Sequence, residues 1–318
     1  MNPRGLGGPV AFVVVTSGAN TAHRARFDHV ERPERIEAAL AGVRPLVEAG
    51  TAELVTATAL DEAALLTVHS ESHVERVRRA CVASAPLDPD TYATPASWKA
   101  ALLAAGAAVE AAERAAEGTP AFAIARPPGH HATRDRAMGF CLFNNVALAA
   151  QRLTEGGRRV AIVDIDVHHG NGTQDIFYDR DDVLYVSLHQ WPLYPGTGAA
   201  DETGAGKGEG FTVNLPVPPG TTHEAWMDVF RRGALPTIEA FAPDVVLVSA
   251  GFDGHARDPL GGLRLTAATY HDAVSDLVAI VPRVAAVLEG GYDLTAVEHC
   301  SAAVGAALMG NRGPPRGV

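Results

Sequence analysis

One stretch decides the fold: Val160-Ala161-Ile162-Val163-Asp164-Ile165-Asp166-Val167-His168-His169-Gly170-Asn171-Gly172. It begins as an apolar run rich in β-branched residues, which predicts a buried strand. Side chains of an extended chain alternate between two faces, so Asp164, Asp166 and His168 are expected to point the same way. Charges at the end of a buried strand cost free energy unless something compensates them. A divalent metal is the simplest compensation, because carboxylate and imidazole both bind zinc well. The alternative is a salt-bridged strand end with a capping aspartate.

The composition indicates a globular chain. Its 318 residues are 47% hydrophobic and 20% charged, so a large core can form. The length suits one large α/β domain or two small ones. Since no internal repeat or linker is visible, we predict a single domain over residues 1–318.

The charge balance and the cysteines narrow the classes of partner and the compartment. The formal net charge of −11 argues against non-specific binding to nucleic acid or to anionic membranes, although a basic substrate such as a lysine side chain fits it. No apolar run approaches the length of a membrane span. Cys81, Cys141 and Cys300 form no CxxC pair, and their odd number favours a reduced, cytoplasmic setting.

Apolar runs alternate with helical patterns along the chain. Strands are expected at 10–15, 121–125, 158–166, 183–188, 244–250 and 283–288, and helices at 33–50, 61–69, 71–83, 96–117, 144–155, 222–241, 266–280 and 293–309. Residues 191–210 are expected to form a loop and residues 313–315 a loose tail. The alternation predicts the α/β class, with a mainly parallel sheet covered by helices on both faces.

Polar clusters follow several of these strands, where parallel sheets bind their ligands. Asp166 and His168 follow one strand and Asp253 follows another, so the three can bind one zinc and leave a position for water. Three protein ligands plus water describe a catalytic site. Taken alone, Asp253 could equally be a turn cap.

A histidine pair and a tyrosine complete the predicted site. His130 and His131 follow a Pro-Pro-Gly run at the end of a strand, and a histidine near a metal can act as general base. Asp164 could support one of them and Asn171 the other. Tyr292 could donate a hydrogen bond to a developing oxyanion. The alternatives are a loop that happens to contain histidines and an ordinary buried tyrosine.

Five segments together resemble the signature of the histone deacetylase family. They are Arg126-Pro127-Pro128-Gly129-His130-His131-Ala132, residues 139–145, residues 164–174, residues 249–253 and Glu289-Gly290-Gly291-Tyr292. The Arg-Pro-Pro-Gly and His-His-Gly-Asn-Gly sequences in these segments are closest to the class II and bacterial branch of that family, which includes acetylpolyamine amidohydrolases. The resemblance implies an arginase/deacetylase fold and hydrolysis of an N-acyl amine that depends on Zn²⁺, with Fe²⁺ as the alternative.

The resemblance also implies roles for single residues. Asp166, His168 and Asp253 would bind the metal. His131 would be the general base and acid, His130 would support it, and Asp164 and Asn171 would lie behind the two histidines. Tyr292 would polarise the acyl carbonyl. Phe140, beside Gly139, and Tyr194 resemble the walls of a lysine tunnel, although Tyr194 replaces the more usual Phe. Asp164, Asp166, His168 and Ser187 resemble a structural K⁺ site, and Arg35 resembles the arginine of an acetate channel.

Two further positions distinguish this chain from arginases and from polyamine-selective deacetylases. Arginases bind two manganese ions and need another Asp where this chain has Gly170, so a single metal is expected. Polyamine-selective deacetylases carry a glutamate at the position of Leu260, so acetyl-lysine peptides are expected to be preferred over acetylated polyamines. The alternative is that Leu260 packs in the core away from the entrance.

Three functions compete at this point. The leading one is a lysine deacylase acting on peptides or proteins, and the second is an acetylpolyamine or other small-amide amidohydrolase. The third is a non-catalytic acyl-lysine binding module, which the sequence disfavours because every catalytic position, Tyr292 included, is filled. The physiological substrate, the acyl length and the oligomeric state stay open.

Overall fold

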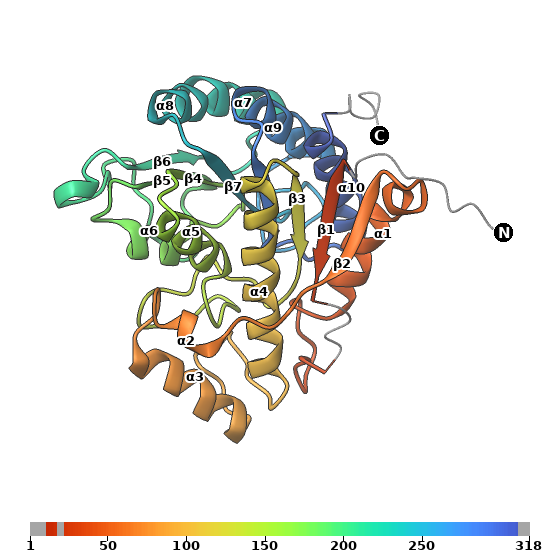
Figure 1. The fold of residues 1–318 in the computed structure, drawn as a ribbon, viewed down its shortest axis with the longest axis vertical. Helices are drawn as coiled ribbons and strands as arrows, with labels where there is room; N and C mark the ends of the chain where they lie inside the picture. The colour runs from red at the N-terminus through yellow and green to blue at the C-terminus, as the bar shows by residue number, and fades with distance from the viewer. Residues whose placement is uncertain (1–10, 18–21, 311–318) are drawn as a thin grey trace.

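The computed structural model describes residues 11–17 and 22–310, and it has an α/β fold built on one eight-stranded sheet (Figure 1). All strand pairs are parallel, and the strand order is β2-β1-β3-β8-β7-β4-β5-β6. The predicted class and the mainly parallel sheet are confirmed. The strands are β1 (Phe12–Thr16), β2 (Ala52–Thr56), β3 (Ala121–Ile124), β4 (Val160–Asp164), β5 (Val183–Gln190), β6 (Thr212–Val217), β7 (Val245–Ala250) and β8 (Val284–Leu288).

Helices cover both faces of the sheet. One layer contains α1, α7, α8, α9 and α10, with α1 and α10 side by side (Figure 1). The other contains α4 and α5, with α3 packed against α4 and α6 against α5. The helices are α1 (Glu34–Glu48), α2 (Glu62–Leu65), α3 (Glu71–Ala83), α4 (Ser97–Ala116), α5 (Asn145–Glu155), α6 (Asn171–Phe177), α7 (His223–Val229), α8 (Leu235–Phe241), α9 (Ala267–Ile280) and α10 (Leu294–Leu308).

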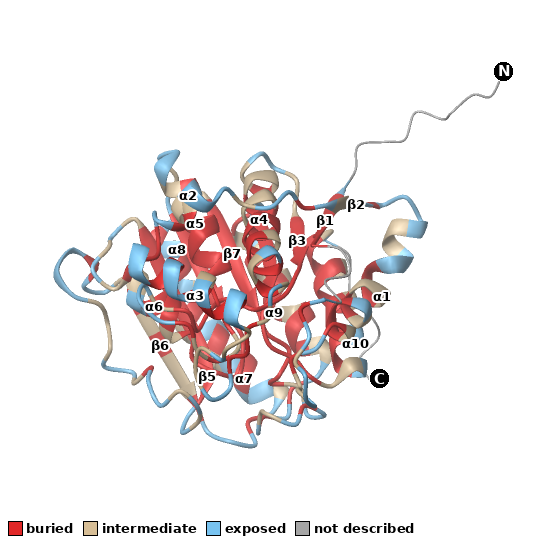
Figure 2. Cartoon of the chain, turned by 90° about the horizontal axis from the view of Figure 1, so that it is seen from below, coloured by how far each residue is buried: buried red, intermediate tan, exposed pale blue. Residues whose placement is uncertain are grey.

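The strands divide their side chains between two cores. In β1, Phe12 and Val14 join the core beneath α1, α9 and α10, whereas Val13 and Val15 join the core beneath α4 and α5. This is the two-residue alternation of an extended chain, with apolar residues on both faces because helices cover both. Figure 2 shows the result, with buried strands at the centre and exposed residues on the outer surfaces of the helices.

Some elements differ from the expectations drawn from the sequence. Both edge strands, β2 and β6, are absent from the predicted elements. β2 exposes most of its side chains, and β6 contains Pro216, so neither has the apolar run of an inner strand. The helix α6 is also additional. The predicted helix 222–241 is α7 and α8 joined by a π-helical segment, Phe230–Ala234.

Two expectations fall at the ends of the chain. Val10 and residues 313–315 lie outside the described residues. Among the helices of the described ranges, none combines the length and the apolar character needed to cross a membrane.

Candidate active site

Four neighbouring strands bring the predicted polar clusters together. β3, β8, β7 and β4 are adjacent in the sheet and parallel, so their carboxyl ends meet at one edge. The segment with His130 and His131 follows β3, Tyr292 follows β8, Asp253 follows β7, and the stretch with Asp166 and His168 follows β4. Residues that are far apart in the sequence therefore share one site.

Asp166, His168 and Asp253 form a buried cluster with the donor set of a divalent metal. Their candidate ligand atoms all lie within 4.8 Å of one another. His168 Nδ1 lies 3.1 Å from Asp166 Oδ1 and 3.0 Å from Asp253 Oδ2. Two carboxylates and one imidazole at this spacing suit a divalent metal ion.

The cluster departs in one detail from the expected common face of an extended chain. Regular strand geometry ends at Asp164. The Asp164 side chain is hydrogen-bonded to His130, whereas the side chains of Asp166 and His168 lie close to Asp253. Asp164, Asp166 and His168 thus belong to one site, but Asp164 lies behind His130 and is not part of the metal cluster.

Backbone N–H groups donate hydrogen bonds to both carboxylates of the cluster. Gly290 N donates to Asp166 Oδ2 at 2.9 Å, and Val167 N donates to Asp253 Oδ1 at 2.9 Å. A Cβ atom at Gly290 would lie 2.1 Å from Asp253 Oδ2, so a larger residue there would displace the carboxylate. Burial, together with the nearby charge of Asp166, raises the pKa of Asp253 to about 7. A divalent cation would offset the free-energy cost of burying two neighbouring carboxylates, so these residues fit a metal.

The two adjacent histidines have different partners, as the sequence analysis expected. His130 Nδ1 donates to Asp164 Oδ2 at 3.0 Å, and His131 Nδ1 donates to Asn171 Oδ1 at 2.8 Å. With its proton on Nδ1, neutral His131 has a lone pair on Nε2.

The pKa values of the two histidines are shifted in opposite directions. Burial would lower the pKa of His130, but the carboxylates of Asp166 and Asp164 outweigh it and hold that pKa well above its usual range. Burial, reinforced by the neighbouring His130, holds the pKa of His131 well below its usual range. A cationic His130 beside a neutral His131 gives the pair one electrostatic partner and one proton acceptor.

Glu289 fixes the loop that carries the histidines. Its Oε2 accepts hydrogen bonds from Gly129 N at 2.6 Å and from His130 N at 3.1 Å, and burial raises its pKa to about 7. No role was predicted for Glu289, although it begins the segment Glu289-Gly290-Gly291-Tyr292. The available signal was a carboxylate directly after the apolar strand Val284–Leu288.

A pocket of about 310 Å³ joins the candidate catalytic residues to the predicted tunnel. The Phe140 ring lies edge-on to the Tyr292 ring, with centroids 5.7 Å apart. Tyr194, whose exposed fraction is 41%, lies edge-on to the His131 ring at 5.2 Å. The pocket is lined by Val30, Asp90, His131, Gly139, Phe140, His168, Leu193, Tyr194, Leu260 and Tyr292.

The lining includes residues of both kinds, predicted and missed. Leu260 is part of it and is half-buried, so it lies where a substrate could contact it. Val30, Asp90 and Leu193 were not among the predicted site residues. They lie outside the quoted motifs, so only the folded chain shows that they reach this pocket.

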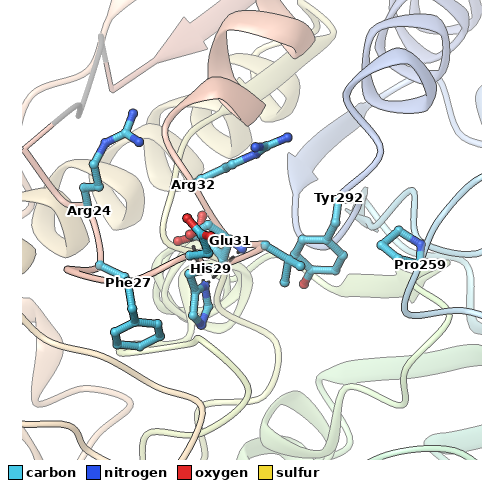
Figure 3. A pocket seen from close by; sticks show the side chains of 10 residues that line it. Arg24, Phe27, His29, Glu31, Arg32, Pro259 and Tyr292 are labelled. Atoms are coloured by element: carbon cyan, nitrogen blue, oxygen red, sulfur yellow. Dashed lines mark hydrogen bonds between the residues drawn. The ribbon is translucent and has the colours of Figure 1, made fainter.

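A second pocket, of about 420 Å³, lies next to the first (Figure 3). Val30 and Tyr292 line both pockets. Arg24 and Arg32 contribute positive charge, but Arg24 is paired with Glu34 at 2.5 Å. In the view of Figure 3, Tyr292 lies between the side chain of Pro259 and those of His29 and Glu31.

Two more residues from the resemblance lie beneath the site. Ser187 pairs in register with Asp164 across β4 and β5, and its hydroxyl lies 2.9 Å from His189 Nδ1. Arg35 is fully buried, and its guanidinium carbon lies 4.9 Å from the centroid of the Tyr292 ring. Their K⁺ and acetate roles stay predictions.

Gly139 offers a direct test of how closely the tunnel packs on His131. Its φ is +55°, and an added Cβ would lie 2.4 Å from His131 Cδ2. Gly139→Ala should therefore displace the imidazole and lower kcat by about tenfold or more, since small misplacements of catalytic groups are costly. Steady-state kinetics at equal metal content would measure this, with Gly118→Ala as the control. Gly118 also has a positive φ but nothing within 4 Å of the added atom. Equal kcat values for the two variants would contradict the expectation.

Comparison with known proteins gives the class and then the family. Residues 29–308 match the histone deacetylase domain. The chain is 43% identical over 255 residues to a probable deacetylase of Archaeoglobus fulgidus, covering 77% of this chain and 71% of that protein. It is 40% identical over 267 residues to a histone deacetylase-like amidohydrolase of Pseudomonas aeruginosa, covering 79% and 69%. These relatives define a hydrolytic deacetylase enzyme, and the chain belongs to the histone deacetylase family.

A solved structure agrees with this family. The crystal structure of the HDA15 HD domain matches with a TM-score of 0.90 and 38% identity, covering 95% of this chain and 88% of that one. The arginase/deacetylase fold expected from the sequence is thus confirmed as a deacetylase fold. The chain spans only 55% and 53% of two Arabidopsis thaliana histone deacetylases, which are longer proteins.

Proposed function

We propose that this chain is a zinc-dependent deacetylase of N-acyl-lysine in peptides or proteins. The observation that carries the proposal is the pocket of about 310 Å³, which has the neutral His131, the candidate ligand His168 and the phenol of Tyr292 on its lining. Its aromatic walls, Phe140 and Tyr194, suit the aliphatic part of a lysine side chain. The family supports deacylation, and the aromatic lining of the pocket supports an acylated amine with an aliphatic side chain.

The residues divide the chemistry among them. A bound zinc or ferrous ion, held by Asp166, His168 and Asp253, would supply Lewis acidity. His131 accepts a proton from the attacking water and returns it to the leaving amine. Cationic His130 favours the negative charge that develops nearby, and Tyr292 donates a hydrogen bond to the carbonyl oxygen as it becomes an oxyanion.

The surroundings of Gly170 support a mononuclear site. A Cβ atom there would lie 2.2 Å from Asp164 Oδ2 and 2.7 Å from the Tyr185 hydroxyl oxygen. An aspartate, which a second metal would need at this position, therefore has no room. We further propose that Asp164 and the backbone around Ser187 hold K⁺, that Arg35 serves an acetate channel, and that residues 1–318 act as one cytoplasmic domain.

A turnover assay separates the three candidate functions. An acetyl-lysine peptide should be hydrolysed, a chelator should abolish turnover, and added Zn²⁺ or Fe²⁺ should restore it. Acetylspermidine, tested in parallel, measures the amidohydrolase alternative. Binding of the peptide without turnover in the metal-loaded protein would instead support the binding module and contradict the proposal.

Leu260 tests the choice between peptide and polyamine. Leucine on the pocket lining disfavours a partly desolvated cation nearby but can pack against a peptide. We therefore expect higher kcat/KM for acetyl-lysine peptide than for acetylspermidine. Leu260→Glu should narrow or reverse the ratio, because a partly buried ion pair contributes about one to three kcal/mol. Leu260→Gln is the matched control for size without charge. An unchanged ratio in Leu260→Glu at fixed salt would show that Leu260 does not select the substrate.

A further inference from the structure

A buried carboxylate that the proposed mechanism does not use lies directly behind Tyr292. Asp258 Oδ2 accepts hydrogen bonds from Tyr292 N at 2.6 Å and from Asp293 N at 3.1 Å. Its other oxygen, Oδ1, accepts from Leu260 N at 3.0 Å. These bonds join two backbone segments, one carrying the phenol and the other carrying a wall of the substrate pocket.

The rest of the Tyr292 turn is held in the same way, by charged side chains on backbone groups. Gly290 N donates to Asp166 Oδ2 at 2.9 Å, and Arg35 Nε donates to Gly291 O at 2.5 Å. Hydrogen bonds to charged groups are roughly twice as strong as neutral ones. Gly291 has a φ of +113°, a backbone conformation that residues with a side chain rarely adopt. Asp258 accepts the backbone hydrogen bond of the last residue of the turn, Tyr292 itself.

The segment that follows Asp258 lines the same two pockets as Tyr292. Pro259 and Tyr292 both line the second pocket, and Figure 3 labels both. Leu260 and Tyr292 both line the substrate pocket. A shift of Asp258 would move the oxyanion donor and the pocket wall with it.

We propose that Asp258 is a positioning residue, which sets the Tyr292 phenol relative to the metal cluster and keeps Leu260 in register with it. The inference rests on the role proposed for Tyr292. A carboxylate is required, because only a group with two acceptor oxygens can accept from both segments at once.

Asp258→Asn tests this with almost no change in shape. Whichever way the amide is oriented, its NH₂ group faces a backbone N–H that formerly met an oxygen. The turn should shift, and kcat should fall about ten- to a hundredfold, as expected for a misplaced catalytic group. Metal per chain, measured by elemental analysis, should stay at the parental value because Asp258 is not a candidate ligand.

A double-mutant cycle distinguishes positioning from a general structural role. If Asp258 acts through the phenol, adding Asp258→Asn to Tyr292→Phe should lower kcat by less than about threefold, because the group being positioned is already absent. Fully additive losses in the double variant would overturn the proposal. Should Asp258→Asn not fold, Asp258→Glu, which keeps the charge but moves it by one methylene, should show the same non-additivity.

Asp293→Asn is the matched control. Asp293 Oδ1 accepts from Ala296 N at 2.8 Å at the start of α10 and pairs with Arg257 at 3.1 Å. Asparagine can still cap the helix, so the substitution removes the charge that pairs with Arg257 and no partner of Tyr292 N. This variant should stay close to the parent in thermal stability, keep most of its kcat and combine additively with Tyr292→Phe. If Tyr292→Phe alone has normal turnover, the proposed role of Tyr292 fails. If Tyr292→Phe is slow but the cycle is additive, only the inference about Asp258 fails.

Discussion

Asp253→Ala is expected to abolish both stoichiometric metal binding and turnover. The variant leaves one carboxylate and one imidazole, and it removes the oxygen that accepts a hydrogen bond from Val167 N at 2.9 Å. Losing a ligand lowers metal affinity directly. The unpaired N–H, buried beneath the site, would also cost about 1–3 kcal/mol of folding stability. Elemental analysis of the purified variant, beside the parent, measures the metal.

Asp253→Asn serves as the control that separates metal loss from unfolding. The amide oxygen can still accept from Val167 N, so thermal unfolding of the metal-free variant should stay close to that of the metal-free parent. The lost negative charge should still weaken metal binding, since the parental carboxylate is buried beside Asp166. One tightly bound zinc per chain in Asp253→Ala would contradict the assignment of Asp253 as a metal ligand, whatever the activity of the variant.

Much of this site was predictable because each residue follows a recognisable strand. Asp166, His168 and Asp253 come after buried β-branched runs, and parallel strands present their carboxyl ends at one edge. The strand order was not predictable in the same way. That β3, β8, β7 and β4 are neighbours depends on how the helices pack over both faces, which no single segment encodes.

Two residues that sequence reasoning missed, Glu289 and Asp258, act through the backbone. Glu289 bonds to Gly129 N, and Asp258 bonds to Tyr292 N, across 160 and 34 positions of sequence. A carboxylate that accepts from a distant backbone N–H leaves no pattern of residue types, unlike a histidine beside a metal ligand. The edge strands were missed for a different reason, because partial exposure removes the apolar run that marks an inner strand.

Tyr292→Phe should fold and bind metal but turn over about a hundred- to a thousandfold more slowly, the usual cost of removing one oxyanion donor. The hydroxyl lies outside the metal cluster, and the backbone bond from Tyr292 N to Asp258 does not depend on it. The ring should also keep its edge-on contact with Phe140. Phenylalanine therefore removes the donor and little else.

The division of that loss between kcat and KM decides whether the phenol acts in the transition state. A hydrogen bond to the ground-state carbonyl would raise KM, whereas one that forms as the oxyanion develops lowers kcat and kcat/KM together. We expect the second pattern, with metal content equal to that of the parent. Phe140→Leu is the control for packing, because Phe140 contacts the same ring but has no donor. Near-normal turnover in Tyr292→Phe would return Tyr292 to a packing role, and the oxyanion would then need another donor.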